Sequence, residues 1–179
     1  MKLDVIENQQ ANPLTTPWYA EGQNFTSTQC GNCCTGGPGF VWISQTEIAR
    51  LAEFLHLSPD AVVEQYGRRI GGNISLRESR NARGEYDCVF LKEERVERAG
   101  SGGEATKVVH TKRSCTIYTV RPLQCRTWPF WEGNLANREM WDNSAKRCHG
   151  MNHGRRFTKP EIEALRDAKD WPAKPPTSK

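Results

Sequence analysis

The chain has 179 residues, a length that favours one domain, and its 36% hydrophobic content predicts a modest core. Its 25 basic residues are dispersed among 21 acidic ones, so the net charge of +4 gives nucleic-acid binding little support. No segment approaches the roughly 18 to 20 continuous apolar residues of a membrane helix, which predicts a soluble protein.

Residues 1–24 are polar, contain two prolines and lack periodicity, so they are predicted to form an N-terminal arm. Trp18 and Tyr19 are the candidates to anchor it. The first residues also lack the basic and continuous apolar regions of a secretory signal, which predicts a cytoplasmic protein. A cysteine-bearing domain over 25–171 and a tail over 172–179 complete the expected organisation.

Two short helices are predicted after the first cysteines. Ser44 and Glu47 form the S-x-x-E capping box that begins helices, and apolar residues at helical spacing extend this helix over 45–56. Ser58, followed by a proline in the first helical position, begins a second helix, and Gly67 ends it. The short connection between them predicts a helical hairpin.

Strand-like pieces follow. The stretches "NISLRES", "YDCVFLKEERVE" and "TKVVHTKRSCTIY" predict a small antiparallel sheet, with "AGSGGE" as a hairpin tip. The stretch "VRPLQCRTWPFWEG" holds two prolines and is expected to be irregular or extended. Thr158 and Glu161 form another capping box and predict a C-terminal helix to about residue 170. The predicted fold class is α+β, a small metal-stapled single domain with long irregular cysteine-bearing loops.

Seven cysteines carry the strongest chemical signal. They occur in "CGNCC" and singly in "YDCVFL", "SCTIY", "PLQCRTW" and "KRCHG". Structural disulfides are uncommon in a reducing cytoplasm, and an odd number cannot all pair, so metal binding is favoured over disulfides. The spacing matches neither a zinc ribbon nor the ferredoxin patterns. Because one zinc ion or one four-iron cluster needs four thiols, either some cysteines are not ligands or the site holds more than one metal.

The neighbouring residues Cys33 and Cys34 add a geometric expectation. In extended backbone, neighbouring side chains point to opposite sides, so the two are not expected to bind one ion together with Cys30. The spacing of Cys30 and Cys33 lets two sulfurs converge on one metal. Cys34 is then expected to reach another iron, a second metal or solvent.

The ordered set "CGNCC", "CVFL", "CTIYTVRPLQCRTWPF" and "CHGMNHG" resembles the YkgJ-type cysteine cluster family, described as zinc- or iron-chelating or as containing an iron-sulfur cluster. The resemblance runs from about Gln29 to Gly154. Two features depart from the family pattern: the link from "CVFL" to "CTIY" is long, and "CHG" replaces C-P-G, which places His149 beside a candidate ligand. The resemblance implies metal binding by all of the cysteines, which are Cys30, Cys33, Cys34, Cys88, Cys115, Cys125 and Cys148.

Other side chains near the cysteines are candidates for supporting roles. Arg121 and Arg126, together with Tyr118, are expected around the site, because guanidinium groups offset the roughly two negative charges of a four-thiolate centre. His149 and His153 are candidate metal ligands, since imidazole commonly binds zinc.

These observations predict a metal-binding protein that holds an iron-sulfur cluster of the 4Fe-4S type, or Zn²⁺, for redox or metal-dependent chemistry. One alternative is a metal carrier or assembly factor that passes ions held at Cys34 and His149 to a protein partner. Another is an interaction module that zinc merely folds. Some larger proteins with this type of cluster are similar to protein-lysine methylases, but no S-adenosylmethionine loop is recognisable, so an enzymatic activity stays open.

Overall fold

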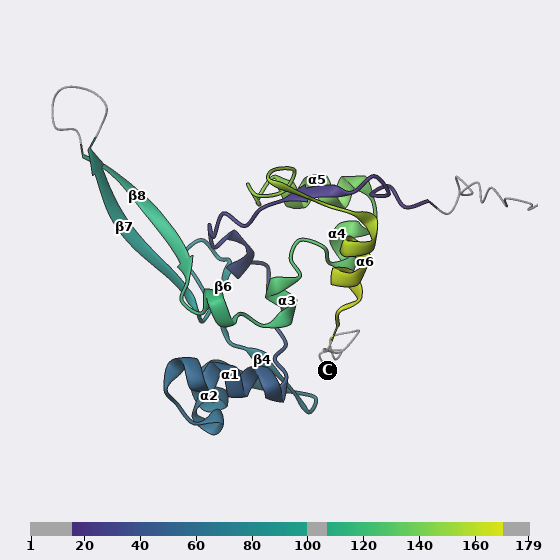
Figure 1. Ribbon diagram of the computed structural model, residues 1–179. Helices are drawn as coiled ribbons and strands as arrows, with labels where there is room; N and C mark the ends of the chain where they lie inside the picture. The colour runs from purple at the N-terminus through teal and green to yellow at the C-terminus, as the bar shows by residue number, and fades with distance from the viewer. Residues whose placement is uncertain (1–15, 100–106, 170–179) are drawn as a thin grey trace, which may run out of the picture.

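The computed structural model describes residues 16–99 and 107–169 of the chain. Short helices and small antiparallel sheets alternate along them, which confirms the predicted α+β class and the C-terminal helix (Figure 1). Among these residues, none of the helices has both the length and the apolar character that crossing a membrane requires.

The predicted helical hairpin is present as α1 (Gln45–Leu55) and α2 (Pro59–Tyr66). Both capping residues act as expected. Ser44 Oγ accepts a hydrogen bond from the Glu47 amide at 3.4 Å, and Ser58 Oγ accepts one from an amide in the first turn of α2. Local capping chemistry therefore determines where both helices begin.

The hairpin packs against strands β3 (Gly67–Ile70) and β4 (Asn73–Leu76), which pair antiparallel. The helices and these strands share one cluster of buried side chains. Cys88 and Cys115, which are partly buried, pack against it. We call this cluster the aliphatic core because aliphatic side chains dominate it. Its buried members are Ile43, Ile48, Leu51, Ala52, Val62, Ile74, Leu76, Phe90 and Ile117.

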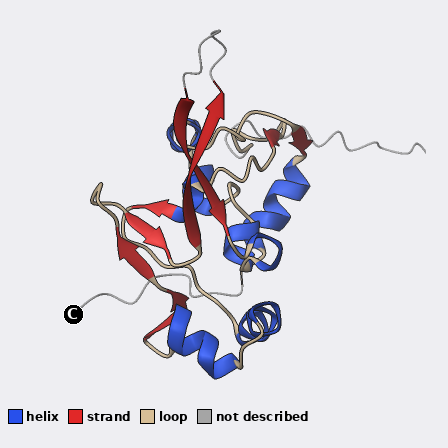
Figure 2. Ribbon diagram, turned by 90° about the vertical axis from the view of Figure 1, so that its left-hand side faces the viewer, coloured by secondary structure: helices blue, strands red, loops and turns tan. Residues whose placement is uncertain are grey.

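The sequence predicts one small sheet, whereas the structure divides the strands into separate pieces. Strands β2 (Thr35–Gly36), β5 (Glu78–Arg80) and β6 (Tyr86–Cys88) pair in the order β2-β6-β5. Strands β7 (Leu91–Ala99) and β8 (Lys107–Cys115) pair with each other as a long ribbon. This ribbon projects away from the helical hairpin (Figure 2). Most of the predicted tip "AGSGGE" lies outside the described residues.

The two ends of the described chain meet in a second cluster. Strand β1 (Gln23–Phe25) pairs antiparallel with β9 (Arg155–Phe157), which precedes helix α6 (Lys159–Asp167). Trp18 Nε1 donates a hydrogen bond to the Leu135 carbonyl at 2.8 Å, so the predicted anchor of the arm is in contact with the domain. We call this second cluster the aromatic core; its buried members are Tyr19, Phe130, Leu135, Trp141, Met151 and Ile162.

The prediction of irregular or extended backbone around Cys125 is partly wrong. The segment forms the 3₁₀-helix η2 (Tyr118–Val120) and the short helices α3 (Leu123–Arg126) and α4 (Glu132–Leu135), and α5 (Arg138–Ala145) follows. Pro122, the first of the two prolines, lies immediately before α3 and does not interrupt it, because proline is tolerated at the beginning of a helix. Helices of four residues are too short to show a helical period in the sequence.

Candidate metal centre

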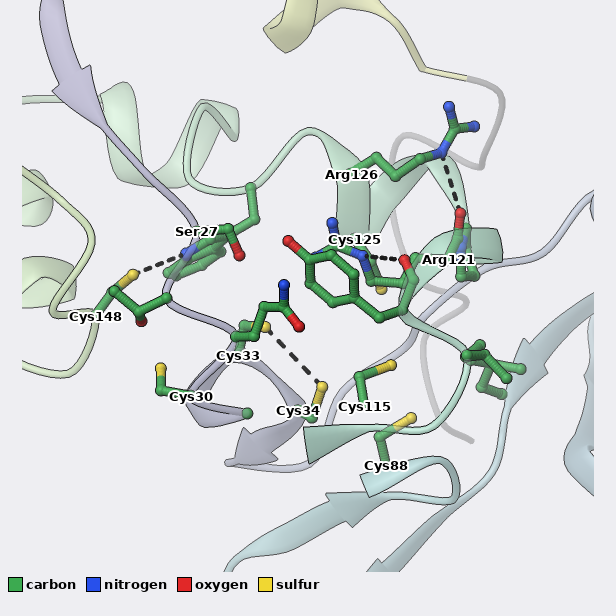
Figure 3. A pocket seen from close by; sticks show the side chains of 18 of the residues that line it. Ser27, Cys30, Cys33, Cys34, Cys88, Cys115, Arg121, Cys125, Arg126 and Cys148 are labelled. Carbon is green, nitrogen blue, oxygen red and sulfur yellow. Dashed lines mark hydrogen bonds between the residues drawn. The ribbon is translucent and has the colours of Figure 1, made fainter. Parts of the chain in front are cut away.

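All seven cysteine side chains line one cavity of about 70 Å³ (Figure 3). Each is a free thiol. Cys88 and Cys115 pack against the aliphatic core, whereas Cys148 packs against the aromatic core. The cavity therefore lies where the two cores meet, and side chains far apart in the sequence close it.

A tight turn presents the first group of cysteines. Cys33 and Cys34 lie on the 3₁₀-helix η1 (Asn32–Cys34), and Gly31 before it has a left-handed φ of 71°. A Cβ on Gly31 would come within 2.9 Å of the side chains of Arg113 and Leu91. Both the left-handed backbone and this close contact therefore favour glycine at this position. The turn brings both neighbouring thiols to the same cavity.

This turn replaces the extended backbone that the expectation assumed, whereas the expectation that the two thiols do not share one ion with Cys30 stays a prediction. In η1 the two neighbouring side chains do not alternate across a strand, and Cys33 Sγ lies 4.0 Å from Cys34 Sγ. Both thiols line the cavity that Cys30 also lines. The sequence signal for this arrangement is the glycine directly before the helix.

The root of the β7–β8 ribbon presents the next two cysteines. Cys88 ends β6, and Cys115 ends β8, where it pairs with Leu91 of β7. The Thr116 amide donates to the Phe90 carbonyl at 2.9 Å, so the two cysteine-bearing segments are joined directly below the ribbon.

Short helices present the last two cysteines. Cys125 lies on α3, and Cys148 follows α5, where its amide donates to the Ser144 carbonyl at 3.1 Å. Trp128 Nε1 donates to Cys148 Sγ at 3.3 Å. An N–H group directed at the sulfur of a candidate ligand can orient that ligand, and the spacing of aromatic residues in the sequence does not reveal this contact.

Three thiols share hydrogen bonds. Cys34 is in hydrogen-bonding contact with Cys115 and with Cys33, whose Sγ lies 4.0 Å from Cys34 Sγ, and these contacts raise the pKa of Cys34 above its usual range. The contacts with Cys34, together with the positive charge of Arg121, lower the pKa values of Cys33 and Cys115 to about 7. Two of the thiols are therefore poised to become thiolates near neutral pH.

Burial acts in the opposite direction on two other thiols. It raises the pKa of Cys88 to about 11 and the pKa of Cys125 well above its usual range. Thiols must lose their protons to bind a metal, so binding at these positions releases protons. The charge of the metal itself provides the compensating attraction.

The residues predicted to support the site also line the cavity. The Arg121 guanidinium carbon lies 3.7 Å from the centroid of the Tyr118 ring, and Arg121 Nε donates to the Tyr118 carbonyl at 2.9 Å. Arg126 Nε donates to the Arg121 carbonyl at 3.0 Å. Their role around a bound metal stays a prediction. His149 and His153 are exposed and do not line the cavity, so metal ligation by them also stays a prediction.

The donor set fits a soft metal, since thiolates select zinc, copper(I) and iron-sulfur clusters. In the described part of the chain, no three histidine, cysteine, aspartate or glutamate side chains stand so that they could hold an ion without moving. The central thiols instead contact one another, with Cys33 Sγ 4.0 Å from Cys34 Sγ. Metal binding requires loss of the thiol protons and an adjustment of the thiols around the cavity.

Comparison with known proteins agrees with this donor set. A family model named CxxCxxCC, described as "Putative zinc- or iron-chelating domain", matches residues 26–149. An uncharacterized protein of Methanocaldococcus jannaschii is 29% identical over 112 residues, which cover 63% of this chain and 48% of the relative. The chain thus spans about half the length of that relative. No solved structure matches the chain. The matched region contains all seven cysteines, and the chain belongs to the CxxCxxCC family of zinc- or iron-chelating domains.

Proposed function

We propose that the chain holds an iron-sulfur cluster or zinc on thiolates drawn from the seven cysteines of the cavity. One observation carries the proposal: seven sulfurs from five separate stretches of the chain face one cavity. A purely structural role for these thiols does not require them to meet, because small buried cysteines fit anywhere in a core. Convergence on one point is the property that metal ligands share.

The number and contacts of the thiols favour a centre with more than one metal atom. Seven thiols exceed the four of a single tetrahedral site, and Cys34 contacts both Cys33 and Cys115. The N–H group of Trp128 toward Cys148 adds the kind of hydrogen bond that tunes an iron-sulfur centre. Because a 4Fe-4S cluster also uses four thiols, the surplus of thiols does not separate it from one zinc site, and the hydrogen bond from Trp128 is the feature that supports the cluster.

Each part of the cavity has a distinct task in this proposal. The thiols bind the metal, Arg121 offsets negative charge beside Cys33 and Cys115, and Trp128 orients Cys148. Apolar side chains such as Leu76 also line the cavity and limit the access of water. An iron-sulfur cluster, when bound, would supply one-electron transfer or an open iron for a ligand.

A carrier function is the second candidate, and one residue favours it. Cys33 is exposed, lines the cavity and has a pKa lowered to about 7, so it is an accessible thiolate through which a metal could enter or leave. Thiol ligands persist in a reducing compartment, which supports a cytoplasmic location. A carrier would also need a protein partner that receives the ion.

The deciding experiment measures iron, zinc and acid-labile sulfide, with the visible absorption spectrum, in protein purified without oxygen from cells supplied with both metals. Iron with sulfide supports a cluster, and zinc alone supports a zinc centre. We expect Cys115→Ser to reduce the bound metal and Glu53→Ala, an exposed control on α1 that does not line the cavity, to retain it. A wild-type protein that takes up neither metal, even after reconstitution, contradicts the proposal.

A further inference from the structure

Glu47 is a buried carboxylate that lies outside the cysteine cavity. It is 5% exposed and belongs to the first turn of α1. Its Oε2 atom accepts from the Ser44 amide at 2.9 Å and from Ser44 Oγ at 3.1 Å, which completes the capping box of α1. A capping box alone uses one carboxylate oxygen and leaves the other without a task.

The second oxygen of Glu47 serves another helix. Its Oε1 atom accepts from the amide of Leu123, the first residue of α3, and Arg126 Nη2 lies 4.0 Å from the same atom. One carboxylate thus joins the beginning of α1 to the beginning of the helix that carries Cys125. Hydrogen bonds to a charged acceptor are about twice as strong as those between neutral groups.

The next residue of α3 repeats the connection. Gln124 Oε1 accepts from the Trp42 amide at 2.9 Å, and Gln124 Nε2 donates to the Phe40 carbonyl at 2.9 Å. The two residues directly before Cys125 are therefore fixed to the first turn of α1 and to the segment that leads into it. Four residues form too short a helix to hold its own position, so these external contacts determine where α3 lies.

We infer that Glu47 is a positioning residue for Cys125: its two-sided hydrogen bonding to Ser44 and Leu123 fixes α3 so that the Cys125 thiol faces the metal cavity. The inference rests on the proposed function only in treating Cys125 as a ligand. A carboxylate suits this position because it has two acceptor oxygens for donors on opposite sides. The amide of a glutamine has only one.

The test compares Glu47→Ala with Ser44→Ala in the full chain. Ser44→Ala weakens the cap of α1 and leaves the Leu123 contact in place, so it controls for lost helix stability. We expect Glu47→Ala to weaken metal binding roughly 10- to 100-fold in chelator competition, as loss of a ligand-orienting contact does. Ser44→Ala should stay within about twofold of the wild type, and Glu47→Gln should fall between them because it keeps one acceptor.

A second readout does not depend on metal. In apo protein, mass spectrometry after iodoacetamide treatment reports how fast each thiol reacts. We expect Glu47→Ala to accelerate alkylation of Cys125 roughly tenfold, the effect of losing one hydrogen bond to a charged group, without altering the rate at Cys88. This result would support the inference even if the wild-type protein bound no metal.

A variant on the opposite partner guards against failure of Glu47→Ala to fold. Leu123→Pro removes the backbone N–H group that donates to Glu47, and Leu123→Ala controls for the lost leucine side chain. We expect Leu123→Pro alone to accelerate alkylation of Cys125. Equal effects of Ser44→Ala and Glu47→Ala, or equal acceleration at Cys88 and Cys125, would overturn the inference, because they indicate general loss of stability.

Discussion

The two cores of this small protein are built in different ways. The aliphatic core draws its buried residues from one continuous stretch, from Ile43 to Ile117. The aromatic core draws them from both ends of the described chain, since Tyr19 packs in the same cluster as Ile162. Nearby residues can form the first core early, whereas the second needs contacts across the whole sequence. The cysteines lie where the two cores meet, so a metal there would join a locally built unit to one that depends on distant contacts.

Truncation inside each core gives the largest expected change. Trp141 and Leu51 are both 0% exposed, and replacing them with alanine should cost about 3–5 and about 2–5 kcal/mol of unfolding free energy. Urea denaturation followed by circular dichroism measures these losses. We expect Trp141→Ala to increase the alkylation rate of Cys148, and Leu51→Ala to increase that of Cys88 and Cys115. If either variant exposed all three thiols equally, the two cores would not be separate units.

Removal of metal should distinguish the cores most directly. Metal present at 1,000 times its Kd would stabilise the protein by about 4 kcal/mol, and a chelator removes this contribution. Because the aromatic core depends on distant contacts, we expect its amide hydrogens, including that of Trp141, to lose more protection than those around Leu51. Hydrogen exchange with mass spectrometry measures both regions in one sample. Equal loss of protection in both cores would contradict the proposed joining role.

A glycine substitution tests the turn between the cores. Gly31→Ala forces a side chain into left-handed backbone and against Arg113, so we expect a loss of about 1–2 kcal/mol of stability. Gly37→Ala is the matched control, since no atom lies within 4 Å of a Cβ placed there. Thermal unfolding compares the variants, and metal content shows whether the displaced turn still binds. A Gly31→Ala protein as stable as the control would show that the turn adapts.

The effect of pH is measured in the reactivity of individual thiols. The thiolate is the reactive form, so alkylation of Cys33 in apo protein should rise with pH through a midpoint of about 7. Cys88, which lies against the aliphatic core, should react only as the pH approaches about 11. Iodoacetamide rates for the two peptides across this pH range provide the measurement. Identical profiles would mean that the contact of Cys33 with Cys34 does not persist in solution.

The parts of the fold that depend on local chemistry follow from the sequence. Ser44 and Ser58 mark the beginnings of α1 and α2 because a cap acts within one turn. The pairing of β1 with β9 has no local signal, since its partners are separated by most of the chain. The helix that carries Cys125 has only four residues and is held by contacts from elsewhere, so its sequence resembles that of a loop.

The candidate site also has parts that the sequence predicts and parts that it does not. Cysteine spacing and the family resemblance single out the residues that meet at the cavity, from Cys30 to Cys148. The contact between Cys33 and Cys34 depends on a 3₁₀ turn that extended-chain reasoning does not consider. The contributions of Trp128 and Glu47 are single hydrogen bonds between distant segments, and such pairs are visible only in three dimensions.

The root of the β7–β8 ribbon bears on how this chain can vary between related proteins. An antiparallel ladder returns the backbone to the point from which it left, here the pairing of Leu91 with Cys115, whatever the length of the strands. Lengthening a loop that is already closed at its base costs little, about 0.6 kcal/mol for each doubling. Residues can therefore be inserted or deleted between Cys88 and Cys115 during evolution while both thiols keep their places.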